Sequence, residues 1–315
     1  MIIQQPPPEG GRQKGIKMAE FVLSCCSTAD APMSFFEERD IKVQYFRWID
    51  NSQTIHVDDL GQSMPYSEFY QRMRDGMTPT TSQPNFQDFI DFFEPVLKDG
   101  KDVLHLSLGS GISGAYGSAM SAAEALNEKY PDRKVLVADS CTASSGYALL
   151  IHMLWLEKKK GKSLEECYQW VLDNRIHAVT WFFPATLTWL VRGGRVKPMA
   201  GFIGNILNIC PILYIVEDGS LAVQTKVRGQ NKAMQYVAKK IASLGIGGED
   251  YSGRCIIAQS DCREDAKKLA DMLTAAYPKM EKPVEITDVG CVIGAHLGPG
   301  AMVLSFWGED RVEKK

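Results

Sequence analysis

The stretch VLHLSLGSGISGAYGSAMSAAEAL, residues 103–126, decides the fold of this chain. Its leucine-rich start, residues 103–108, predicts a buried strand with a polar break at Ser107. Gly109 and Gly111 predict a turn, and Ser113 stands where the N-cap of a following helix is expected. Free N–H groups at a helix start favour an anion, and the Ser110 and Ser113 hydroxyls add donors. The stretch therefore predicts strand, turn and helix, with an anion site at the turn.

Strands and helices alternate on both sides of this stretch. Strands are expected at residues 21–25, 41–49 and 134–138, and helices at 66–74 and 144–160. This order predicts an α/β fold with a parallel, Rossmann-like sheet covered by helices on both faces. Ligands of such sheets bind at the carboxyl ends of the strands. The Ser110 loop, Cys26-Ser27 and Asp139-Ser140 are all expected there.

The second half of the chain contains two uncharged runs, residues 176–191 and 198–216. Prolines, asparagines and glycines inside the second run argue against a membrane span. We expect buried helix-and-strand units, with a core strand at 209–216 and a hairpin into 221–227. Core packing and the wall of a lipophilic pocket both explain such runs. The predicted organisation is a leader at 1–18, a parallel α/β domain at 19–165 and a second α/β domain at 166–315.

Composition excludes several classes of function. A net charge of −3 leaves no basic stripe for nucleic acid. The eight cysteines have no metal-type spacing, which predicts no zinc site and a reducing, cytoplasmic compartment. Residues 1–18 contain no secretion signal.

Residues 109–114 also match G-x-G-x-x-G between a strand and a helix, as in dinucleotide-binding proteins. Asp139, at the end of the next strand, stands 25 residues after Gly114, and several elements precede the motif. A stand-alone nucleotide-dependent oxidoreductase is therefore an alternative hypothesis. No P-loop, kinase signature or G-x-S-x-G elbow is present, and no histidine partner for Cys26 is evident.

Three further segments carry candidate site residues. Thr81 precedes a helix expected after Pro84, where it either caps the helix or turns its hydroxyl to a ligand shared with Ser113. His296 lies in a glycine-rich segment, 289–301, expected to be a loop, whereas the other four histidines are expected to be structural. Arg192 and Arg195 flank two glycines, where they either complement a helix C-terminus or clamp an anion or partner.

Together these motifs resemble the DegV family over about residues 20–308. The motifs are residues 81–84 (TSQP), 110–116 (SGISGAY), 139–140 (DS), 192–195 (RGGR) and 294–300 (GAHLGPG). The resemblance implies two α/β domains that bury one long-chain fatty acid between them. It also implies a binding subunit that presents the carboxylate to a separate ATP-dependent kinase subunit, which makes an acyl phosphate.

By this resemblance, Thr81 and Ser113 hold the carboxylate, and the turn itself predicts Ser110 as a further donor. His296 and an arginine of residues 192–195 complete the network or face the kinase. The family usually has an aspartate where Cys26 stands and a threonine where Ala115 stands. No catalytic motif, cofactor or metal is expected. Lipid transport or storage without a kinase is the remaining alternative.

Overall fold

Four parallel strands form the first sheet of the computed structural model, which describes residues 20–197 and 209–312. The strand order is β2-β1-β6-β7, with bounds β1 (Phe21–Cys26), β2 (Ile41–Gln44), β6 (Asp102–Ser107) and β7 (Val135–Asp139). Every residue of β1 and β6 is buried, because both strands are central and helices cover both faces. The predicted parallel α/β sheet is confirmed.

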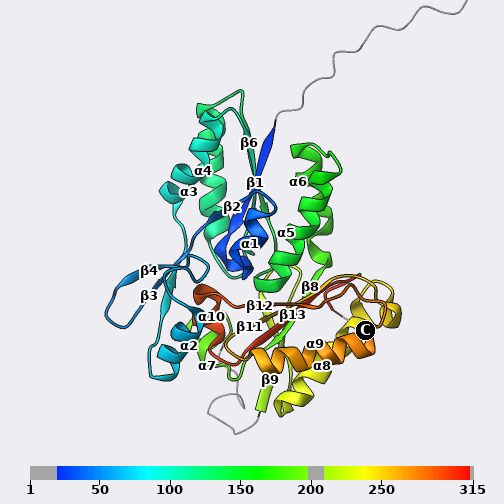
Figure 1. The fold of residues 1–315 in the computed structure, drawn as a ribbon. Coiled ribbons are helices and arrows are strands. Elements are labelled where there is room, and N and C mark those ends of the chain that lie inside the picture. Colours follow the sequence, from blue (N-terminus) through cyan, green and yellow to red (C-terminus); the bar gives the residue numbers. More distant parts are fainter. Residues whose placement is uncertain (1–19, 198–208, 313–315) are drawn as a thin grey trace, which may run out of the picture.

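Helices cover this sheet on both sides (Figure 1). On one side lie α3 (Phe86–Lys98) and α4 (Ala115–Lys129). The buried alanines of α4 allow this helix to pack closely on the strands. On the other side lie α5 (Ser144–Lys159) and α6 (Leu164–Asn174). Helix α6 packs against β7 although it crosses the expected boundary at residue 165. The division at residue 165 stays a prediction.

Six strands form the second sheet, in the order β10-β9-β8-β13-β11-β12. The bounds are β8 (Ala178–Phe183), β9 (Ile209–Ile215), β10 (Leu221–Arg228), β11 (Cys255–Gln259), β12 (Glu285–Asp288) and β13 (Met302–Trp307). Only β11 and β12 pair in parallel among these neighbours. Helices α8 (Gln230–Leu244) and α9 (Arg263–Ala276) cover one face. The second α/β unit and its hairpin are therefore as expected.

Helix α5 lies between the two sheets. It contacts β8, β11 and β13 of the second sheet, and its residues from Ser144 to Leu154 are almost all buried. A helix that is apolar around its whole circumference is suited to such a position, since no face needs to meet water. The start of α5 therefore lies at the junction of the two sheets.

Shorter elements surround this junction. They are α1 (Met33–Glu37), α2 (Tyr66–Arg74), α7 (Thr188–Arg192), α10 (Cys291–Leu297), and the 3-10 turns η1 (Ser27–Ala29), η2 (Arg175–His177) and η3 (Gly248–Asp250). A small third sheet, β4-β3-β5, contains β3 (Arg47–Ile49), β4 (Ile55–Val57) and β5 (Thr80–Ser82).

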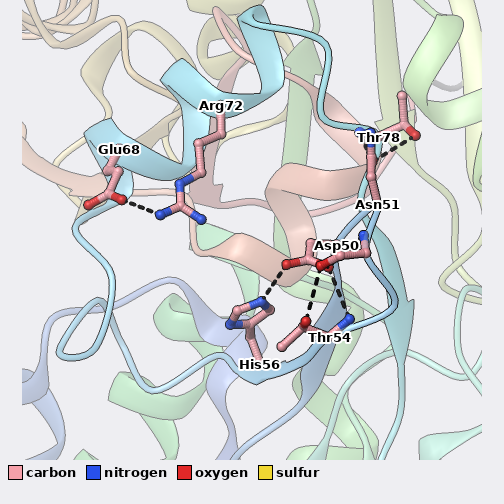
Figure 2. Close-up of polar contacts among 8 residues, drawn as sticks. Asp50, Asn51, Thr54, His56, Glu68, Arg72 and Thr78 are labelled. Carbon is pink, nitrogen blue, oxygen red and sulfur yellow. Dashed lines mark hydrogen bonds and ion pairs between the residues drawn. The ribbon is translucent and has the colours of Figure 1, made fainter.

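Polar contacts fix the loop of the β3–β4 hairpin (Figure 2). The Asp50 carboxylate accepts hydrogen bonds from the Thr54 amide at 3.0 Å and pairs with His56 Nε2 at 3.0 Å. Asn51 Oδ1 accepts from the Thr78 amide at 2.8 Å, just before β5 begins. The hairpin therefore anchors the strand that carries Thr81.

Four local expectations need correction. Residues 41–49 form two strands, β2 and β3. Thr81 lies on β5 and caps no helix, because Asn85 caps α3 through a reciprocal pair with Asp88. Gly114, not Ser113, is the N-cap of α4. His296 lies on α10 and not in a loop.

Part of the second uncharged run, residues 198–208, and the expected leader at 1–18 lie outside the described residues. Within the described ranges, no helix combines the length and apolarity needed to cross a bilayer.

Candidate functional site

A cavity lies between the two sheets, lined by residues of the third sheet, the loop after β6, and the elements α5, β8, α7 and α10. Its apolar lining includes Phe46, Leu108, Phe182, Ile215, Val292, Ile293, Leu297 and Val303, all buried. Five polar residues of the lining are only half-buried, namely Thr81, Gln83, Ser113, Arg195 and His296. The cavity therefore runs from a polar mouth to a buried apolar interior. We use "polar mouth" for these five residues.

Thr81 and His296 form the first contact of the polar mouth. Thr81 Oγ1 lies 2.9 Å from His296 Nε2. The last turn of α10 carries His296, and two buried aspartates hold the other end of this helix. Asp30 accepts from the Gly290 amide at 2.9 Å, and Asp58 accepts from the Val292 amide at 3.1 Å.

His296 is neutral at pH 7. Burial, and secondly the charge of Arg195, lower the pKa of His296 to about 4. Its Nδ1 atom faces Gly193, where an added Cβ would lie only 2.1 Å away. Nδ1 has no hydrogen-bond partner among the described residues. When Nε2 carries the proton and donates to Thr81 Oγ1, the Thr81 hydroxyl proton is free for an anion.

Ser113 and Gln83 form the second contact. The Ser113 hydroxyl donates to Gln83 Oε1 at 3.0 Å and accepts from the Ala115 amide at 3.2 Å. A Cβ atom on Gly114 would lie 2.9 Å from Gln83 Nε2, so the glycine leaves room for this amide. Gln83 was not among the expected site residues. Its place inside the TSQP motif, two residues after Thr81, was the available signal.

The two arginines of residues 192–195 have different positions. Arg195 lines the cavity, where its Nε donates to the Ile112 carbonyl at 2.9 Å. The exposed Arg192 lies outside the lining, with its guanidinium 4.9 Å from the ring centre of Trp189. Gly193 ends α7, as the helix C-cap interpretation expected. Arg195 is therefore placed to meet a ligand, and Arg192 to meet solvent or a partner.

The expected donor Ser110 does not lie in the cavity lining. Its amide and hydroxyl both donate to the Asp139 carboxylate, at 3.0 and 2.5 Å. The turn between β9 and β10 packs on the same glycine loop, since a Cβ on Gly111 would lie 2.4 Å from the Ser220 nitrogen. Backbone from the second sheet thus approaches the loop where a dinucleotide phosphate would bind. The oxidoreductase hypothesis gains no support from this geometry.

Cys26 has a histidine neighbour after all. Its Sγ atom lies 3.6 Å from His105 Nε2, and both side chains are completely buried. Burial raises the pKa of Cys26 to about 11 and lowers that of His105 to about 3. Both groups are neutral at pH 7, so the pair is no thiolate nucleophile. The structural role expected for His105 fits these contacts.

None of the described His, Cys, Asp and Glu side chains forms a group of three or more that could hold a metal ion. The polar mouth instead offers hydroxyl, amide and guanidinium donors around a neutral imidazole. Such a donor set suits a carboxylate rather than a cation. The apolar interior behind it suits a long hydrocarbon chain.

Residues 26–309 match the sequence profile of the DegV family, which is described as a family of uncharacterised proteins. The chain belongs to the DegV family. This confirms the resemblance seen in the five motifs. A DegV domain-containing protein of Clostridium perfringens is 35% identical over 295 residues, 93% of this chain and 99% of the relative.

Two other similar proteins have descriptions that name a ligand. A protein of Thermotoga maritima, described as a fatty acid-binding protein, is 32% identical over 283 residues, 88% of this chain and 93% of the relative. The solved structure of the fatty acid kinase B3 protein of Streptococcus pneumoniae, loaded with linoleic acid, has a TM-score of 0.78. It is 20% identical, with 92% of this chain and 100% of that chain covered, and it supports the likeness of fold alone.

Proposed function

We propose that this chain binds one long-chain fatty acid in the cavity, with the carboxylate in the polar mouth and the tail in the apolar interior. The observation that carries the proposal is the convergence of Thr81, Ser113 and His296 at the mouth of an otherwise apolar cavity. The 32% identical fatty acid-binding relative supports the same ligand class.

The physical chemistry of the site agrees with this ligand. A carboxylate leaving water needs hydrogen-bond donors. The Thr81 hydroxyl and the Gln83 amide can provide them, and the Ser113 hydroxyl can do so when its proton turns from Gln83 Oε1 to the ligand. Arg195 adds a cation at the same end. A sixteen-carbon tail gains on the order of 10 kcal/mol gross, at about 0.8 kcal/mol per buried methylene. The cost of ordering the ligand and the protein on association reduces this gain in free energy, but the net result still favours tight binding.

We further propose that the chain presents the bound carboxylate to a separate ATP-dependent kinase subunit and has no catalytic group of its own. The half-buried mouth supports this, because a carboxylate there lies near the surface while the tail is enclosed. Arg192 and Lys197 are exposed cations next to the mouth in the chain, suited to an acidic partner surface. Membership of the DegV family supports the same role through the resemblance described above.

Reconstitution tests the proposal. Delipidated protein is mixed with palmitate, ATP and the kinase subunit of a DegV-containing bacterium, and acyl phosphate is trapped with hydroxylamine. Formation that depends on this chain is the expected result. Binding of palmitate without acyl phosphate would favour transport or storage. Absence of binding would contradict the proposal as a whole.

A further inference from the structure

The buried interior of the cavity contains one polar feature that a plain hydrocarbon tail does not use. Ser144 lines the cavity at 3% exposure, and Asp30 stands beside it at 1% exposure. Neither Ser144 Oγ nor Asp30 Oδ2 makes a hydrogen bond of ordinary length and angle among the described residues, although the Ser144 hydroxyl is near enough to the carboxyl to act on the Asp30 pKa. Leaving a buried polar atom unsatisfied is unfavourable. Two neighbouring unsatisfied atoms therefore call for a polar group that binds them.

Backbone conformation holds both residues in place. Ser144 has φ 54° and Asp30 has φ 53°, in the left-handed region that residues other than glycine seldom adopt. Asp30 is fixed there by its Oδ1 bond to the Gly290 amide. Strained, buried residues of this kind concentrate at ligand sites, where surrounding structure maintains them.

The pair can both donate and accept a hydrogen bond. Burial raises the pKa of Asp30 well above its usual value, and the nearby Ser144 hydroxyl only partly opposes this. The Asp30 carboxyl offers a hydrogen-bond acceptor in either protonation state. The Ser144 hydroxyl has one donor and free acceptor positions. An alcohol is the simplest group that satisfies both.

Asp30 binds the end of α10 opposite to the end that carries His296. Asp30 contacts Gly290 before α10, whereas His296 is on its last turn, roughly 9 Å farther along the helix axis. Thr180, another buried hydroxyl of the lining, is already satisfied by Ser305 Oγ at 3.0 Å. Ser144 and Asp30 therefore differ from the other buried polar groups of the cavity.

We propose that Ser144, supported by Asp30, is a subsite for a hydroxyl group on the middle of the acyl chain, so that hydroxylated long-chain fatty acids are a ligand class of this protein. The inference rests on the proposed fatty acid binding and adds a preference to it. An apolar wall would reject a chain hydroxyl, because its desolvation would go uncompensated. Here the hydroxyl would satisfy two protein atoms, which favours it over the plain chain.

Calorimetric titration of the delipidated protein tests this subsite. The ligands are stearate and a set of monohydroxystearates whose hydroxyl moves stepwise along the middle of the chain. At least one of these is expected to bind about fivefold more tightly than stearate, as one well-made hydrogen bond provides. Weaker binding of every hydroxylated acid would overturn the subsite, and a bound water would then explain the two atoms.

Variants of Ser144 test whether this residue causes the preference for a hydroxylated acid over stearate. Ser144→Ala removes the hydroxyl, and Ser144→Gly removes it while also tolerating the left-handed backbone. Both are expected to lose the preference for the hydroxylated acid and to keep stearate affinity within about twofold. Thr180→Val is the matched control, with the preference unchanged. A preference that survives both Ser144 variants would overturn the inference, whereas loss of stearate binding by the wild type would instead contradict the proposed function.

Discussion

A Cβ atom on Gly193 would lie 2.1 Å from Nδ1 of His296. The glycine at the end of α7 therefore allows the imidazole to reach Thr81. The close approach of Gly193 and His296 joins two motifs that are about a hundred residues apart in the chain. It explains why the 192–195 segment needs a glycine beside its arginines, independently of any partner.

Gly193→Ala should displace His296 and weaken fatty acid binding at least tenfold, because the Thr81–His296 contact is lost while the cavity interior stays intact. Isothermal titration with palmitate measures the change. Gly117→Ala is the control, since no atom lies within 4 Å of its added Cβ. That variant should bind normally and be slightly more stable, as expected for Gly to Ala in a helix. Equal affinities of the two variants would contradict this role of Gly193.

Thr81→Ala and Ser113→Ala should each weaken palmitate binding by about 1–3 kcal/mol, the range for donors to a charged acceptor. Ser110→Ala should leave affinity unchanged, because Ser110 donates to Asp139 outside the cavity lining. Titration of the three variants with palmitate shows whether the polar mouth or the glycine loop binds the carboxylate. A large loss in Ser110→Ala with none in the other two would contradict the site.

Gln83→Glu should weaken palmitate binding far more than Gln83→Met, because a second carboxylate beside the ligand repels it. Binding of hexadecanol, which has the same tail and no charge, should change little between the two variants. Competition against a fluorescent fatty acid measures both ligands. If the Glu and Met variants bind palmitate equally, Gln83 does not face the head group.

Arg192→Ala should bind palmitate normally but form acyl phosphate slowly, since Arg192 lies outside the cavity lining and is exposed. Arg195→Ala should instead lose affinity for palmitate. Binding and reconstituted phosphorylation are measured on the same preparations. Identical defects in both variants would show that the two arginines act together, against the separation seen here.

The contribution of His105 should lower the free energy of unfolding as the pH decreases from 6.5 towards 4. Burial lowers the pKa of His105 from 6.5 to about 3, so the unfolded chain binds the proton first in this range. The resulting slope is about 1.4 kcal/mol per pH unit for one such group. Burial of Asp58, whose pKa rises to about 6, acts in the opposite direction.

His152 and His296 also have lowered pKa values and act in the same direction as His105, whereas Asp30 and Asp288 have raised pKa values and act with Asp58. His105→Gln should therefore lose less stability than the wild type as the pH falls over this range. An unchanged slope in that variant would show that His105 titrates normally in the folded protein.

Sequence patterns predicted much of the fold because local signals and global packing agree here. The leucine-rich strand at 103–108 and the alanine-rich helix after it were both found. Thr81, Ser113 and His296 were also identified, and the structure brings all three to one cavity.

Other features depend on contacts that no local pattern contains. Residues 80–82 form a strand because they pair with β3, which overrides the capping signal of their hydroxyls. His296 is helical because Asp58, far away in sequence, caps the start of α10. Ser110 was expected to be a free donor, but in the structure its hydroxyl donates to the Asp139 carboxylate. The strained pair Asp30 and Ser144 appears only when η1 and α5 meet.

The ligand carried by the purified protein tests the central claim most directly. The protein is expressed, purified without detergent and extracted, and the extract is analysed by mass spectrometry. The account predicts one long-chain fatty acid per chain, and a lower melting temperature after delipidation, because a ligand bound only by the native state stabilises it. Extracts without fatty acid, together with a melting temperature that palmitate, oleate and hydroxystearate all leave unchanged, would contradict it.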